Sequence, residues 1–284
     1  MRRFTNSLVA ILTGLCALLS AAALFSIVAA ILFKGLPALS WRFLTEQIKL
    51  VGADGGIFYN LIGTFILIST ALATAAPLAV AISLTHGVYL HRKSRIRRCL
   101  ELFLHVLNGV PSILLGLFGL IVFVGFLHLG KSWLTGGILL GIMILPTVTV
   151  ALMERIASIP GSYLEAAVAL GLTQTQIIFS VILRQSFSGL LTGSLLGLAR
   201  AAGETAPIMF TATIFAGAGF PTGIKESPVL SLPYHIFILA QDSFDPAVRT
   251  KIWATAIVLL GLVFGLSLIA LPFRLKLHEE AHHA

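Results

Sequence analysis

The sequence has little charge. Asp, Glu, Lys and Arg together make up 11% of its 284 residues, whereas an ordinary soluble domain carries about 25%. Hydrophobic residues account for 57% of the chain. This balance excludes a soluble globular protein and predicts an integral membrane protein.

Cysteine is equally scarce, with only Cys16 and Cys99 in the chain. Neither has an obvious partner in an oxidising compartment, so no disulfide framework is expected. His105 and His128 lack the spaced histidine, cysteine or carboxylate companions that a metal site needs. No nucleophile stands with a base and an orienting acid. We therefore predict no catalytic centre and no metal site.

What the chain has instead is a series of long uncharged runs. They follow Arg3, Asp54, Glu101, Lys131 and Lys251, and each is at least 22 residues long. About 20 apolar residues cross a bilayer as a helix. With the helix after the polar loop at 158–185, these runs predict an all-α protein with six transmembrane helices, at about 8–33, 58–85, 101–127, 136–152, 186–209 and 252–273.

The net charge of +8 would suggest nucleic acid as a partner in a soluble protein, but here its distribution matters more. Basic residues crowd one short loop at 92–98, precede the first span at Arg2 and Arg3, and follow the last at Arg274 and Lys276. Positive charge marks the cytoplasmic side of short loops. Both termini are therefore predicted to be cytoplasmic in one multi-pass domain, 1–284, that lies in the lipid bilayer and binds no nucleic acid.

One motif is misleading. Residues 125–132, G-F-L-H-L-G-K-S, match the phosphate-loop pattern G-x-x-x-x-G-K-[ST]. A phosphate loop joins a strand to a helix and needs an acidic partner for magnesium, whereas this octamer ends a membrane helix. We attribute the match to chance and expect ATP hydrolysis, with its magnesium, only in a partner subunit.

The polar loop within 153–185 contains two capping-box patterns, Ser162-x-x-Glu165 and Thr173-x-x-Gln176, with Gly171 between them. They predict two short helices joined at the glycine. Small Ala166 and Ala167 would let another surface approach closely. From the residues alone the loop is a docking hairpin, a re-entrant hairpin packed on its own domain, or, remotely, a DNA-reading helix-turn-helix.

The helix after this loop carries two lines of residues spaced four apart. Gly189, Gly193 and Gly197 form the small-residue pattern that lets membrane helices pack closely. Arg200 and Glu204 fall on a second line with Ser188 and Thr192. The helix is therefore predicted to be interior.

Arg200 and Glu204 are charged residues inside a membrane helix, where each costs about 2.5 to 3.5 kcal/mol on insertion scales. They either pair with each other or line an anion path. A guanidinium fits phosphate or sulfate oxygens equally well. An ionised carboxylate only accepts hydrogen bonds, so Glu204 would favour hydrogen phosphate over deprotonated sulfate.

Several motifs resemble a known family. E-A-A-V-A-L-G at 165–171 is similar to the E-A-A-x-x-x-G signature of bacterial ABC importer permeases, and R-A-A-G-E-T-A-P at 200–207 is similar to the corresponding segment of the PstA-type permeases of phosphate importers. V-P-S-I-L-L-G-L-F-G at 110–119 adds to the match, which runs from about 55 to 210.

The resemblance implies a type I importer permease (MetI-like) fold with its core at about 55–275. It also implies the substrate pathway at Arg200, Glu204 and Thr205. A cytoplasmic coupling helix would bind the ATPase through Glu165, Ala166, Ala167 and Gly171. The implied partners are a homologous PstC-like permease, two nucleotide-binding ATPase subunits that hold ATP and Mg, and a periplasmic or extracellular phosphate-binding protein, all at the bacterial inner membrane.

The expected function is thus that of a permease subunit, forming half of the translocation pathway of an ATP-driven importer of inorganic phosphate. Within that class the substrate could instead be sulfate, molybdate or phosphonate. From a different class, the same Arg200 and Glu204 would serve an ATP-independent channel or an ion-coupled carrier as a charge relay.

Overall fold

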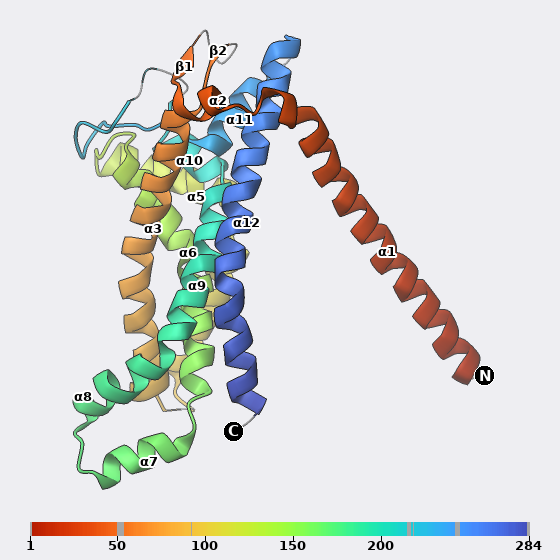
Figure 1. Cartoon of the computed structure of the whole chain (residues 1–284). Coiled ribbons are helices and arrows are strands. Elements are labelled where there is room, and N and C mark those ends of the chain that lie inside the picture. The colour runs from red at the N-terminus through yellow and green to blue at the C-terminus, as the bar shows by residue number, and fades with distance from the viewer. Residues whose placement is uncertain are drawn as a thin grey trace.

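The computed structural model describes residues 2–49, 54–91, 93–214, 217, 219–241 and 245–282. Figure 1 shows a molecule built almost wholly from helices. Five of them are long and apolar enough to cross a membrane. These five contain α1 (Arg2–Gly35), α3 (Phe58–Leu84), α6 (Trp133–Ala157), α9 (Leu183–Gly203) and α12 (Pro246–His282).

A bent pair of helices brings the number of spans to six when it is counted as one span. Here α4 (Arg95–Gly109) meets α5 (Ser112–Gly119), which continues into the π-helical turn η4 (Leu120–Phe126), at an angle of 96°. Pro111 lies at the break, where it cannot donate a backbone hydrogen bond and disfavours helix in the residue before it. The span expected at about 101–127 is therefore formed by two helices that meet at Pro111 and not by one straight helix. Arg95, Arg97 and Arg98 also lie on α4 and not in a loop.

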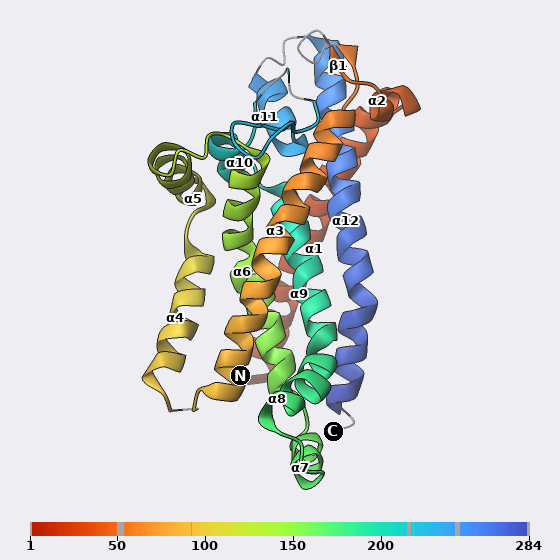
Figure 2. The same cartoon turned by 90° about the vertical axis from the view of Figure 1, so that its left-hand side faces the viewer.

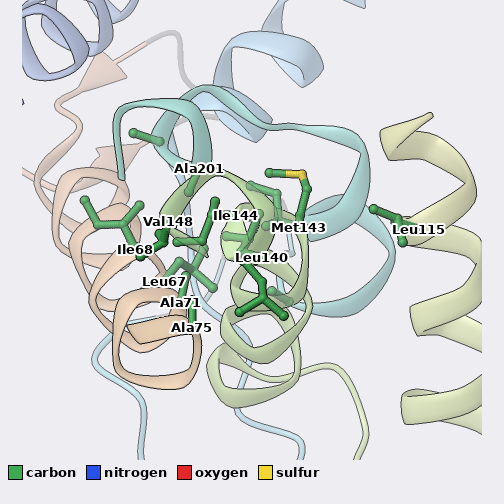
Figure 3. Packing of buried hydrophobic residues seen from close by; sticks show 14 of the residues in the cluster. Leu67, Ile68, Ala71, Ala75, Leu115, Leu140, Met143, Ile144, Val148 and Ala201 are labelled. Carbon is green, nitrogen blue, oxygen red and sulfur yellow. The ribbon is translucent and has the colours of Figure 1, made fainter. Parts of the chain in front are cut away.

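The core lies where α3, α6 and α9 pack side by side (Figure 2). Figure 3 shows Leu67 and Ala71 of α3 against Leu140 and Ile144 of α6, with Ala201 of α9 close by. All five side chains are buried. In a bilayer such contacts stabilise mainly through close packing, because lipid tails are as apolar as leucine.

Glycine sets the distance between these helices. A Cβ added to Gly193 of α9 would lie 2.9 Å from Ala151 Cβ of α6. On the other face of α6, a Cβ at Gly141 would collide with Thr74 Oγ1 of α3. The backbones can approach this closely only because both positions lack a side chain.

A cap of short elements closes one end of the bundle. It contains η1 (Leu36–Ala38), α2 (Trp41–Thr45), an antiparallel pair of strands with Ile48 opposite Gly55, α10 (Ala206–Thr211) and α11 (Leu232–Gln241). The strands are β1 (Ile48–Lys49) and β2 (Asp54–Gly55). Thr64 Oγ1 of α3 accepts the Leu232 amide at 3.0 Å, which ties α11 to the bundle.

Helix α1 behaves differently from the other long helices. Figure 1 shows it leaning away from the bundle, and its main packing partner in the chain is α12. At its end, Lys34 Nζ lies 4.9 Å from the ring centre of Trp253, and Gly35 packs on the Trp253 backbone. The apolar surface of α1 is therefore left without a covering within this chain.

The other end of the bundle carries the polar loop. It consists of α7 (Gly161–Ala169), α8 (Gln174–Ile177) and the π-helical turn η5 (Ile178–Ile182), which leads into α9. A further π-helical turn, η3 (Thr85–Tyr89), ends the α3 span. The two marked chain ends lie in the half of the molecule that carries α7 (Figure 1).

Candidate functional site

Arg200 lies in the last turn of α9, and Glu204 is the first residue beyond the helix. Glu204 has an extended backbone, φ −78° and ψ 135°, and α10 begins two residues later. Pro207 explains the break, because it has no amide hydrogen to donate to the carbonyl of Gly203. The expected continuous helix at 186–209 was therefore wrong, and Glu204 does not lie on its regular four-residue line.

The break loosens the expected ion pair. Arg200 Nε lies 3.9 Å from Glu204 Oε1, which is near the outer limit of a salt bridge. The shorter contact of Arg200 is with a different helix, since its Nη1 donates to Asn108 Oδ1 at 2.8 Å. Arg200 is thus held chiefly by Asn108, 92 positions away in the sequence.

Asn108 belongs to the other broken span, one turn before Pro111. The two breaks therefore meet, and each contributes a polar side chain. The packing beyond them is close, since a Cβ on Gly116 of α5 would lie 2.9 Å from the carbonyl oxygen of Ala206. Broken helices expose backbone and polar groups at membrane depth only where protein buries them or they line a cavity. The meeting point is therefore the candidate substrate site.

The exposure of these side chains suits a site open to a small solute. The Arg200 side chain is 37% exposed and that of Glu204 19%, while Thr205 is partly buried beside them. A guanidinium has five N–H donors. The bond to Asn108 fixes its plane through one of them and leaves others for oxygens of an anion.

The first helix of the polar loop, α7, ends in a glycine C-cap. The Gly171 amide donates to Val168 O at 2.9 Å and the Leu172 amide donates to Ala167 O at 3.2 Å. Gly171 has φ +74°, so the three features make a complete Schellman cap. The glycine is needed by this turn, which positions α7 relative to α8.

The side chains of α7 divide into two sets. Glu165 and Ala166 are exposed, whereas Ala167 is 4% exposed and packs inside the chain. Exposed Val168 and Leu170 give α7 an outward apolar surface. A partner that docks here would therefore meet Glu165, Ala166 and Leu170 directly, while Ala167 supports the loop from within.

The two capping patterns had different outcomes. Thr173 and Gln176 form a complete capping box at α8, as the spacing predicted. Ser162 does not cap α7, because the helix begins at Gly161 and its N-cap position is Pro160. The Ser162 prediction was wrong because proline already fixes the entry to that helix.

Gly189, Gly193 and Gly197 of α9 face α6. A Cβ on Gly189 would lie 2.5 Å from Arg155 Cβ, and one on Gly197 would lie 3.2 Å from Val148 Cγ2. Arg155 also donates to Gln185 O at 3.0 Å, so a cation links the same two helices near the loop.

Sequence reasoning missed Asn108 as a partner of Arg200, and it missed a polar cluster at the start of α4. Glu101 Oε1 lies 2.7 Å from His86 Nε2 and 3.3 Å from Arg97 Nε. His86 is 6% exposed and comes from the end of the α3 span. The four-residue spacing of Arg97, Glu101 and His105 was the signal that could have found this cluster.

Residues 125–132 do not form a phosphate loop. They begin within the last residues of the π-helical turn η4, and Ser132 caps α6 by accepting the Thr135 amide at 3.1 Å. Among the described residues no strand leads directly into them, since the strands lie far earlier, at Ile48–Lys49 and Asp54–Gly55. Across the described ranges, no group of three metal-ligating side chains was found either.

A helical bundle with two broken membrane helices, a charged pair at the break and an exposed helical loop at one end defines a multi-pass membrane transport protein. The family model described as "binding-protein-dependent transport system inner membrane component" matches residues 76–275. The chain belongs to that family, whose members are the permease components of such transport systems.

Two relatives are similar over most of their length. The "Probable phosphate transport system permease protein PstA" of Methanocaldococcus jannaschii is 34% identical over 99% of this chain and 96% of its own. The phosphate transport system permease protein PstA of Haemophilus influenzae is 31% identical over 84% of this chain and 83% of its own.

Among solved structures, an inward-facing structure of the MetNI methionine ABC transporter is similar, with a TM-score of 0.55 and 16% sequence identity. The likeness covers 77% of this chain and 94% of that one. It shows the fold, which is the expected MetI-like fold.

Proposed function

We propose that the chain is a permease subunit of an ATP-driven importer of inorganic phosphate and forms half of its translocation pathway. The observation that carries the proposal is the 2.8 Å bond that holds Arg200 on Asn108 where two broken membrane helices meet. An oriented guanidinium is suited to phosphate oxygens. The two relatives described above are both named as phosphate transport permeases.

Glu204 supplies the choice among oxyanions in this proposal. Its weak contact with Arg200, at 3.9 Å, leaves carboxylate oxygens able to accept a hydrogen bond. Hydrogen phosphate can donate that bond, whereas sulfate at neutral pH cannot. Thr205, next in the chain, adds a hydroxyl that can donate or accept a hydrogen bond.

Two surfaces of the chain support the proposed partners. The most apolar stretch of α1 is 0% buried within this chain, which suits packing against a second, PstC-like permease. The loop of α7 and α8 stands out from the bundle with Leu170 80% exposed, which suits docking to an ATPase. Two such ATPases would bind ATP and Mg, and an outer phosphate-binding protein would deliver the substrate.

The same arrangement supports an orientation in the membrane. The basic residues at the start of α4, both chain ends and α7 lie in the same half of the molecule (Figures 1 and 2). Positive charge favours the cytoplasm. We place this half, with both termini, on the cytoplasmic side of the inner membrane, where ATPase closure would push α7 and reorient the two permeases around Arg200.

The test is uptake of labelled phosphate into vesicles that contain all the subunits. Uptake should require ATP, and Arg200→Gln should abolish it. Glu204→Gln should reduce the preference for phosphate over sulfate, while Lys225→Gln, in the loop before α11, should leave that preference unchanged. Uptake without ATP would identify a carrier or channel, and uptake of another oxyanion in place of phosphate would reassign the substrate.

A further inference from the structure

A polar stripe runs along α4 from the cytoplasmic end to the candidate site. It contains Arg97, Glu101, His105 and Asn108, spaced four, four and three residues apart and hence on one helix face. At its start, Glu101 is held by Arg97 and His86. At its end, Asn108 bonds Arg200. The middle of the stripe is His105, which the proposed function does not use.

His105 and Asn108 line a pocket of about 300 Å³ between α4 and α6. Across from them stand Thr147, Val150 and Glu154 of α6. The pocket extends from the level of Asn108 toward the end of α6 that leads into the loop. It therefore lies between Arg200 and the side that we assign to the cytoplasm.

The hydrogen-bonding roles in this pocket are defined by the contacts around it. His105 Nδ1 lies 2.7 Å from the carbonyl oxygen of Glu101, which can only accept, so this nitrogen carries the proton. In the neutral ring Nε2 is then an acceptor. Asn108 uses its oxygen for Arg200, which leaves its amide nitrogen as a donor. The Glu154 carboxylate is a second acceptor.

We propose that this pocket is an inner binding site for phosphate on its way to the cytoplasm, a proposal that rests on the function proposed above. Dihydrogen phosphate, which carries two O–H groups, donates one hydrogen bond to His105 Nε2 and one to Glu154, and it accepts one from the Asn108 amide. Sulfate has no proton to donate. A phosphodiester such as a lipid headgroup lacks one too, so the pocket selects the free inorganic ion.

The experiment places a reporter cysteine in the pocket of the complete transporter. Cys16 and Cys99 are first replaced by serine, which removes both native thiols. Val150→Cys then introduces a thiol at a pocket position that is 37% exposed. Val106→Cys, on α4 but outside the pocket lining and 59% exposed, is the matched control. Labelling by a small charged thiol reagent is followed in inside-out vesicles of zwitterionic lipid.

Phosphate at about ten times its dissociation constant should slow labelling of the Val150→Cys variant about tenfold. Labelling of the Val106→Cys variant should not change. Sulfate at the same concentration, or anionic phospholipid in the vesicles, should give no protection. Adding His105→Leu or Glu154→Gln to the Val150→Cys variant should remove most of the protection by phosphate.

Equal protection by sulfate, equal protection of both thiols, or no protection of the Val150→Cys variant would overturn the inner site. Those results would not contradict the proposed function, provided that the transporter without these substitutions takes up phosphate when ATP is supplied. Failure of that uptake would instead refute the proposed function itself. The two measurements therefore separate the two proposals.

Discussion

Helices α1 and α6 are both long apolar helices, yet they have opposite surroundings. Within its most apolar stretch, α6 is 67% buried inside the chain, whereas α1 is 0% buried. The two sequences predict only that each helix lies in a membrane. An apolar side chain suits contact with lipid as well as contact with a protein neighbour, so the sequences do not separate the two surroundings. What separates them is the pattern of small residues. Gly137 and Gly141 of α6 meet α3 side chains, while Gly14 of α1 has no neighbour within 4 Å.

This difference separates helices that other parts of this chain cover from surfaces that are left exposed and need a partner. The α3–α6–α9 core is covered, since its buried side chains pack against one another. The surface of α1 and that of α7 and α8 are not, since both expose large apolar side chains. The candidate substrate site lies beside the covered core, where Asn108 holds Arg200 in place, and the proposed coupling surface is one of the exposed parts.

The largest effect should come from inserting the same side chain into both kinds of helix. Gly193→Leu places its Cβ against Ala151 and should lower the free energy of unfolding by about 1–3 kcal/mol or more. Gly14→Leu makes the same change where nothing lies within 4 Å and should not destabilise the isolated chain. Thermal unfolding of the detergent-purified protein measures both, and equal losses would refute the division.

The second prediction concerns the exposed loop. Leu170→Asp puts a charge on a side chain that is 80% exposed, so the fold should be unchanged while retention of the ATPase falls about tenfold, or about 1.4 kcal/mol. Co-purification of the ATPase with the permease measures this. Ile224→Asp, which makes a similar change in the loop before α11, should retain the ATPase fully, and a loss there would show that the effect is not local.

A smaller, pH-dependent effect should arise in the cap of the bundle. His235 is buried, and that burial, with a smaller contribution from Lys251, lowers its pKa to about 4 from the ordinary 6.5. Between these values the unfolded chain binds the proton more readily than the folded chain does. Stability should thus be complete above pH 6.5 and fall as the pH drops toward 4.

Unfolding midpoints measured across that range provide the check. His235→Leu should flatten the acid side of the curve, because it removes the group that takes up the proton. His128→Leu, at an exposed position, should keep the slope of the unaltered protein. An unaltered slope in the His235→Leu variant would contradict the assignment.

The smallest effect concerns the attachment of α1. Trp253→Leu removes a cation–π contact with Lys34 that contributes about 0.5–1 kcal/mol at an exposed site. The angle between α1 and α12 should become more variable. Spin labels on native Cys16 and on a Gly265→Cys variant, in a Cys99→Ser background, would show a broader distance distribution. Lys34→Arg keeps the cation and should leave the distribution narrow.

Several features of the site could be predicted from the sequence. The two helices of the loop, joined at Gly171, follow from local signals, as does the capping box at Thr173. The pairing of Arg200 with Asn108 could not be predicted, because nothing local links residues 92 positions apart. The end of α9 at Gly203 was signalled by Pro207, but hydrophobicity alone suggested a continuous helix.

The sequence by itself determined that this is a membrane protein, roughly where its helices cross, and that the polar loop before α9 holds two short helices, because length, apolarity and capping residues are local properties. The tertiary structure decided which helices are buried, that Glu204 lies outside α9, and that Arg200 is oriented by Asn108. Those facts depend on how two helix breaks from distant parts of the chain meet, and only packing brings them together.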